Sequence, residues 1–403
     1  PRQNFLLYMT GQFGALERKS IEPIALHVED GNVRAMQRFV SDVVWNEELI
    51  LKRYHALVAE DMGDPEGILI FDESGFPKKG DDSVGVARQY CGSIGKVDNC
   101  QVGVFAAYAS RHGYALLDKR LYVPQQWFGD SHLSRRRKCK VPPGLSFKTK
   151  PQLAAEMYRE VREGGIIPFK YVVADSIYGT NPDFIGAIEE RVGTTYFVSM
   201  RSDTLCWLQE PSTETRTIRG GKQGKKVKRV LPETEKKPLE FVTVARGINS
   251  FFWYRRKVSE GTKGPIEYEF TKRRITLCKD GLPYKTVWLI IKRTLGAKRE
   301  YSYYISNRNV STILRHRIQE FSDNRVARVV VLRCPAGIAG EGIPLKKSVI
   351  AHRRPDRLRR VSVGPILGGP GSLLPGAEGM SRLPDSRRDR FSQESNDPWE
   401  GAG

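Results

Sequence analysis

The sequence predicts a mixed α+β or α/β protein, with a helical region first, a strand-and-helix core next, and a β-rich insertion in that core. Residues 1–62 carry apolar side chains at three- and four-residue spacing, which is the period of an amphipathic helix. From residue 63 to about 201, short apolar runs alternate with helix-spaced segments. Beyond residue 342 the chain is rich in Gly, Pro, Ser and Arg and lacks periodicity, which predicts a disordered C-terminal tail.

The N-terminal region is predicted to form short helices over residues 21–28, 32–45 and 47–62. Several short basic helices in succession are typical of a small DNA-contacting domain. A plain helical bundle fits the same pattern. The composition alone leaves both interpretations open.

The central region shows a definite order of elements. Three strands are expected first, joined as a meander, and then a helix, a strand, a second helix and a last strand. This is the element order of the ribonuclease-H-like fold, which defines an architecture without proving an activity. The expected strands cover residues 68–71, 101–109, 114–123, 171–174 and 195–200, and the expected helices cover 151–163 and 183–191.

A lysine-rich, strand-prone stretch from residue 202 to about 300 interrupts this core. Strands are expected at 241–244, 251–255, 274–278 and 286–291, and a glycine-containing basic loop at 220–229. The loop is interpreted either as a solvated hairpin tip or as a segment that follows a phosphate backbone. The predicted divisions are 1–62 (helical, DNA-binding), 63–201 (ribonuclease-H-like core), 202–300 (β-rich basic insertion), 301–332 (remnant of the last core strand and helix) and 333–403 (low-complexity tail, disordered or frameshifted).

Two acidic residues stand where apolar runs end. Asp72 follows the run 68–71, and Asp175 follows the run 171–174. Two strands that each end in an aspartate can bring two carboxylates together at one sheet edge, which is how proteins hold divalent ions for phosphoryl transfer. Strands also end in Asp because Asp favours turns, so neither residue alone would indicate a site.

The charge balance points to a polyanionic partner. The 403 residues carry a formal net charge of +20, and nucleic acid is the usual partner of so basic a chain, although a solubility surface is the alternative. No apolar run approaches the roughly 18 residues of a membrane span.

The six cysteines are scattered without a C-x-x-C pair, so neither a zinc site nor a disulfide framework is indicated. A reducing cytoplasm is the expected location.

Three motifs resemble a known family. They are Phe71-Asp-Glu-Ser-Gly-Phe-Pro-Lys-Lys-Gly80 with its continuation to residue 109, Leu117-Asp-Lys-Arg-Leu-Tyr-Val-Pro-Gln-Gln-Trp127, and Ala174-Asp-Ser-Ile-Tyr-Gly179. Together these blocks resemble the insertion-sequence transposases of the DDE superfamily, in the group with a β-rich insertion in the catalytic domain. The resemblance covers roughly residues 15–307.

The resemblance implies a ribonuclease-H-like catalytic core, two Mg²⁺ ions with Mn²⁺ as a substitute, and cleavage and joining of DNA. Asp72 matches the first acid of the family's triad, and Asp175 matches the second. The implied partner is double-stranded DNA, both the terminal inverted repeats of the element and the target, with a homodimer as one arrangement of the complex. The protein is then expected in the cytoplasm, associated with the nucleoid when bound to DNA.

The third acid is where this chain departs from the family pattern. The family places a Glu in an Arg-Trp-x-Ile-Glu type sequence after a Ser-Asn pair, but the segment after Ser306-Asn307 has no tryptophan and no following lysine. Glu320 is the nearest candidate, and Gln319 occupies the position that an Arg-Ile-Glu register would give the acid. Arginine also replaces lysine abruptly here, which favours translation in a changed reading frame.

Basic residues near the acids are candidate DNA contacts. Either lysines beside a metal site grip the scissile strand, or they belong to a solvated turn. The candidates are Lys78, Lys79, Arg88, Lys225, Lys226, Lys228 and Arg229. Two alternatives to an active transposase remain open: a metal-dependent nuclease of the same fold, and a catalytically inactive, truncated transposase that only binds DNA.

Overall fold

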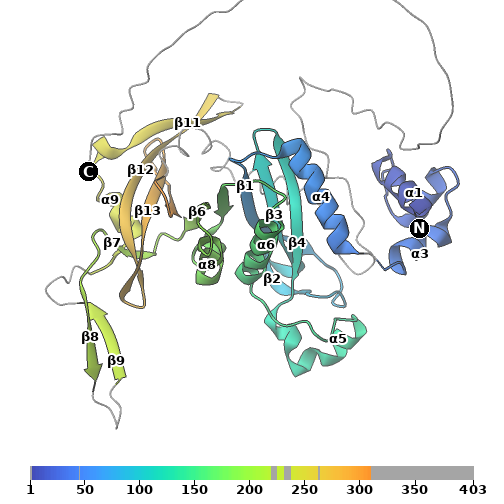
Figure 1. Ribbon diagram of the computed structural model, residues 1–403, viewed down its shortest axis with the longest axis horizontal. Helices are drawn as coiled ribbons and strands as arrows, with labels where there is room; N and C mark the ends of the chain where they lie inside the picture. The colour runs from blue at the N-terminus through green and yellow to red at the C-terminus, as the bar shows by residue number, and fades with distance from the viewer. Residues whose placement is uncertain (1, 45, 219–224, 231–236, 262–263, 310–403) are drawn as a thin grey trace, which may run out of the picture. The chain divides into compact units, whose positions relative to one another are not determined.

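The computed structural model describes residues 1–403 except residues 1, 45, 219–224, 231–236, 262–263 and 310–403 (Figure 1). All described residues belong to one compact unit. None of the described helices is long and apolar enough to span a membrane. The expectations for Glu320 and for the tail lie outside the described residues.

Four helices open the chain, in agreement with the helical periodicity: α1 (Arg2–Phe13), α2 (Ile21–His27), α3 (Val33–Ser41) and α4 (Glu47–Met62). The first three share a small core of their own, centred on the buried side chains of Tyr8, Ile24, Ala25, Met36 and Phe39. Asparagine side chains cap two of these helices, at the start of α3 and of α4. Such caps satisfy backbone N–H groups that have no partner within the helix.

A mixed sheet follows, built on the strand order β14-β6-β5-β1-β3-β2. β1 (Ile68–Pro77) is antiparallel to β3 (Lys96–Ser110), which also pairs with β2 (Ala87–Cys91) and β4 (Gly113–Tyr122). On its other side β1 is parallel to β5 (Tyr171–Ala174), and β5 is parallel to β6 (Thr195–Met200). The expected mixed sheet with helices is therefore present.

Two helices cover one face of this sheet, α6 (Lys150–Gly164) and α8 (Pro182–Glu189). α6 begins with a capping box, in which Thr149 and Gln152 satisfy each other's backbone N–H groups. Alternate residues of β1, namely Leu69 and Phe71, join the main core with the apolar faces of α6 and α8. Ile68 and Ile70 point to the other face, where they pack with Phe197 and Ile290.

The insertion between β6 and β14 (Tyr301–Ser306) is rich in strands, as expected. Its long strands are β11 (Tyr254–Gly261), β12 (Gly264–Lys279) and β13 (Leu282–Thr294), and β13 pairs with β14 and so continues the central sheet. Shorter elements are β7 (Leu205–Trp207), β8 (Thr213–Ile218), β9 (Lys225–Val230), β10 (Leu239–Glu240) and the 3-10 helix η4 (Ser250–Phe252).

Two strands expected in the insertion are wrong. Residues 241–244 belong to the helix α9 (Phe241–Arg246), because Phe241, Val244 and Ala245 lie at helical spacing and are buried in the core, which outweighs the β-propensity of Val and Thr. Residues 250–252 form η4, capped by the Asn249 side chain, and the strand begins only at Tyr254.

Candidate active site

The two predicted acids lie at the same level on neighbouring parallel strands, Asp72 within β1 and Asp175 directly after β5. In the register of β1 and β5, Phe71 pairs with Ala174 as the last matched position, and Asp72 and Asp175 are the next residues of their chains. Adjacent strands lie roughly 4.8 Å apart in the hydrogen-bonding direction. The register therefore sets Asp72 and Asp175 at neighbouring positions, but the expectation that the first strand ends at Asp72 is wrong, because pairing with β3 carries β1 on to Pro77.

Local hydrogen bonds orient both carboxylates. An Asp72 carboxylate oxygen accepts from the Glu73 backbone N–H at 2.8 Å. Asp175 caps the short helix α7 (Ser176–Gly179), and its carboxylate accepts from the Ile177 N–H at 2.9 Å. Burial and, next, the negative charge of Glu73 raise the pKa of Asp175 to about 6. Negative charge is thus crowded beside the end of β5.

A third acid, Glu73, directly follows Asp72 in β1 and was missed from the sequence. Its side chain accepts hydrogen bonds from the Lys150 ammonium at 2.8 Å and from the Tyr178 hydroxyl at 2.8 Å. Since side chains alternate along a strand, Glu73 continues the α6 side of β1, whereas Asp72 continues the opposite side. Glu73 therefore links β1 to the first residue of α6 and to α7.

Tyr178 is fully buried, and its pKa depends on the nearby acids. Burial raises its pKa first, and the negative charges of Glu73, Asp175 and Asp72 raise it further. The phenol therefore stays protonated and can donate to Glu73. One buried hydroxyl thus lies within electrostatic range of all three carboxylates. The sequence signal for this role was the Tyr of Asp-Ser-Ile-Tyr-Gly, but nothing in its spacing identified the partner.

The predicted DNA contacts fall in three places. Lys78 and Lys79 follow the end of β1, where Lys78 is half-buried and burial lowers its pKa, and Arg88 is exposed on β2. Lys225, Lys226, Lys228 and Arg229 belong to β9, which pairs antiparallel with β8. The basic segment is thus partly a strand of a hairpin, where a loop was expected.

The donor set fits part of a magnesium site. Carboxylate oxygens are the ligands that Mg²⁺ prefers, and a divalent cation would relieve the crowding that raises the pKa of Asp175. Among the described residues, no cluster of three or more His, Cys, Asp or Glu side chains is arranged to hold a metal. Asp72 and Asp175 are thus the two candidate ligands in the described part of the chain, and Glu320 lies outside that part.

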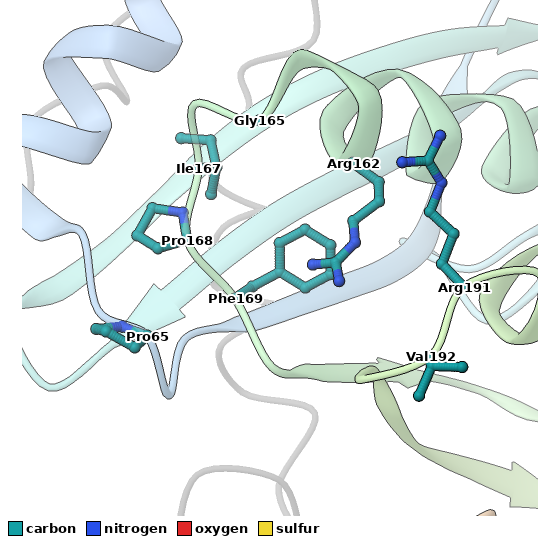
Figure 2. Close-up of a pocket in the computed structure, with 8 residues that line it drawn as sticks. All are labelled: Pro65, Arg162, Gly165, Ile167, Pro168, Phe169, Arg191 and Val192. Carbon is teal, nitrogen blue, oxygen red and sulfur yellow. The ribbon is translucent and has the colours of Figure 1, made fainter.

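A shallow pocket of about 540 Å³ opens at the opposite end of β5 (Figure 2). Its lining includes Arg162 and Arg191, and the Arg162 guanidinium packs 5.0 Å from the centre of the Phe169 ring. Phe169 precedes β5, whereas Asp175 follows it. The pocket is therefore separate from the acid pair.

Comparison with known proteins identifies the family. A family model described as DDE superfamily endonuclease matches residues 1–265, about two thirds of the chain. The "Probable transposase for insertion sequence element IS701" of Microchaete diplosiphon is 25% identical over 286 residues, covering 70% of this chain. The chain spans 65% of the length of that relative. The family resemblance inferred from the motifs is confirmed.

Two solved structures are only distantly similar. The piggyBac transposase synaptic complex with hairpin DNA has a TM-score of 0.33 at 12% identity, covering 83% of this chain and 59% of that one. The NurA nuclease from Sulfolobus solfataricus has a TM-score of 0.26 at 11% identity, covering 74% and 84%. At these scores neither likeness defines the fold.

Proposed function

We propose that this chain, which belongs to the DDE superfamily endonucleases, is a DNA transposase that cleaves and joins DNA at the ends of an insertion sequence. One observation carries the proposal: Asp72 and Asp175 directly follow the same registered pair, Phe71 and Ala174, on parallel neighbouring strands. The name of the IS701 relative and the net charge of +20 support the same conclusion. Terminal inverted repeats and target DNA are the proposed substrates.

The proposed architecture is a ribonuclease-H-like core. Supporting it, β1, β3 and β4 form an antiparallel meander, interrupted by the short edge strand β2, and α6 then leads to the parallel strand β5. α8 leads on to β6, which is also parallel. The β-rich segment between β6 and β14 is then an insertion ahead of the last strand. This order places both acids near the middle of the sheet.

Asp72 and Asp175 are the residues that would hold Mg²⁺ or Mn²⁺. When bound, a pair of such ions activates the attacking oxygen and stabilises the leaving oxygen of a phosphoryl transfer. Within the protein, the Glu73 contacts with Lys150 and Tyr178 keep β1 and α7 fixed relative to each other. The backbone N–H groups of Glu73 and Ile177 orient the two carboxylates before any ion arrives.

The test is DNA cleavage by the full chain on a duplex carrying the terminal sequence of its element. We expect Mg²⁺-dependent nicking at the element end, lost in Asp72→Asn and in Asp175→Asn while DNA binding persists. Cleavage that survives both substitutions would refute the assignment. Asp203→Asn, at an exposed turn, is the matched control and should cleave as the wild type does.

A catalytically inactive, DNA-binding remnant is the second candidate. It is favoured by the segment after Asn307, which lacks the tryptophan and lysine of the family pattern and offers Glu320 as its nearest acid. A chain with only two of three acids would bind DNA in a salt-dependent manner and leave it intact. Cleavage that is abolished by Glu320→Ala would reject this alternative and identify Glu320 as the third acid.

A further inference from the structure

The short helix α5 (Leu133–Lys138) carries four consecutive basic residues, Arg135 to Lys138, and Lys140 follows shortly after. None of the residues from 131 to 155 is acidic. A run of this kind is usually a solvated surface, so its contacts decide whether it is more than that. Two of its basic side chains form ion pairs within the protein, and the others form none in the described part of the chain.

Arg135 and Lys138 fasten α5 to the turn that follows β1. The Arg135 guanidinium donates to the Asp81 backbone carbonyl and lies 3.8 Å from its carboxylate, and Lys138 forms an ion pair with Asp82 at 2.6 Å. Arg135 also packs 4.9 Å from the ring centre of the buried Trp127. The helix and the turn therefore form one structural unit, which we call the α5 lobe (residues 78–86 and 125–140).

The remaining cations of the lobe have no acidic partner in the described part of the chain. Arg136, Arg137 and Lys140 make no ion pair there, and neither do Lys78 and Lys79 on the turn. Residues 78–82 and 130–140 together hold seven lysines and arginines against three aspartates. Uncompensated positive charge at this density favours binding of a polyanion.

One continuous strand, β1, connects the first acid to the α5 lobe, so one polyanion can lie along both. β1 runs in unbroken register along β3 from Asp72 to Pro77, and the Lys78 N–H still donates to the Asn99 carbonyl at 2.8 Å. Because strand side chains alternate, Lys78 projects from the same face as Asp72. Six residues at roughly 3.3 Å each give about 20 Å between these positions. Duplex DNA covers that length in about six base pairs at 3.4 Å each.

We propose that the α5 lobe, whose nearest residue to the acids along β1 is Lys78, binds the phosphate backbone of duplex DNA at least about six base pairs from the phosphate that lies at Asp72 and Asp175. The inference rests on the proposed function, because the acid pair sets the origin of the distance. Arg136, Arg137 and Lys140 contact phosphates, while Arg135 and Lys138 hold the lobe in place. The lobe thereby fixes the direction in which the duplex leaves the active site.

The first experiment measures the salt dependence of binding. The probe is a fluorescein-labelled duplex with the terminal repeat of the element, titrated with the full chain over a series of KCl concentrations. Each lost phosphate contact reduces the magnitude of the slope of log K against log salt by about 0.9. The triple variant Arg136→Ala, Arg137→Ala, Lys140→Ala should therefore show a slope whose magnitude is smaller by about two to three. An unchanged slope would overturn the proposal.

The matched control removes three exposed cations elsewhere, Lys237→Ala, Lys298→Ala and Arg299→Ala, and should leave the slope near that of the wild type. Equal loss in both triple variants would mean that net charge alone matters, and would overturn the proposal. Thermal unfolding of the α5 variant should match the wild type, because Arg135 and Lys138 are retained.

The second experiment places the contact. Single methylphosphonate substitutions, counted from the outer end of the terminal repeat, should weaken binding of the wild type at about the sixth position inward or beyond it, and should not weaken binding of the triple variant there. Interference elsewhere only, or none, would overturn the placement. Asp72→Asn separates the two proposals: it should abolish cleavage and leave this interference pattern intact. The binding measurements therefore test the proposed DNA contact of the α5 lobe even if the chain never cleaves DNA.

Discussion

Replacing Asp175 with Asn should stabilise the metal-free protein at neutral pH. Asp175 is half-buried at the start of α7, where burial and the nearby Glu73 charge raise its pKa from 3.8 to about 6. The folded chain therefore binds this proton more tightly than the unfolded chain does. Stability falls as pH rises from 3.8 through about 6, and the full penalty applies above that window.

The difference between the two pKa values corresponds to a free energy on the order of 3 kcal/mol. Asn keeps the side-chain oxygen that accepts from the Ile177 N–H, so the helix cap survives while the charge disappears. The variant should gain little below pH 4 and the full amount near pH 7, a rise in Tm of roughly 5 °C for a protein of this size. Excess MgCl₂ should stabilise the wild type near pH 7 and leave the variant unchanged.

Thermal unfolding monitored by circular dichroism at several pH values, with EDTA or with MgCl₂, measures both effects. Asp183→Asn, at an exposed position on α8, removes one carboxylate outside the site and should show neither. An Asp175→Asn protein that is less stable than the wild type near pH 7 in EDTA would refute the electrostatic reasoning. A pH-independent gain would do the same.

Three further perturbations test other parts of the structure. Glu73→Gln and Tyr178→Phe should each lower the free energy of unfolding in urea by about 1–3 kcal/mol. The double variant should lose less than the sum of the two, because both changes remove the same buried hydrogen bond, and strict additivity would contradict that link. Gly179→Ala should destabilise by about 1–3 kcal/mol, because a Cβ would lie 2.4 Å from the Ser199 carbonyl oxygen, and an unchanged Tm would show that the backbone yields. Replacing the four basic side chains of β9 with Ala should flatten the salt dependence of DNA binding, and an unchanged slope would remove this hairpin from the interface.

Strongly periodic or strongly apolar segments were predictable from the sequence. The predicted helix 47–62 and the predicted strands 171–174 and 195–200 coincide with α4, β5 and β6. The shared level of the two acids followed from the same runs, because Phe71 and Ala174 are matched in register, although Asp72 lies within β1 and not at its end. β1 continues to Pro77 beyond the predicted turn, since pairing with β3 persists through Gly75 and Phe76.

Features that depend on distant contacts were not predictable. Glu73 reads as an ordinary polar residue until the fold brings Lys150, 77 residues later, against it. The α5 lobe likewise requires Trp127 and the turn at Asp81 to meet. In α9 the β-branched residues pointed to a strand, and only the buried spacing of Phe241 and Val244 identifies a helix.

The central claim is that Asp72 and Asp175 hold divalent ions together, and iron-directed cleavage of the protein backbone tests it without requiring transposase activity. Fe²⁺ loaded in place of Mg²⁺, with ascorbate and peroxide, cuts the chain near its ligands. We expect fragments that end near residue 72 and near residue 175, suppressed by excess Mg²⁺ and lost in Asp72→Asn and Asp175→Asn. Cuts at other positions only, or cuts that persist in both variants, would contradict the claim.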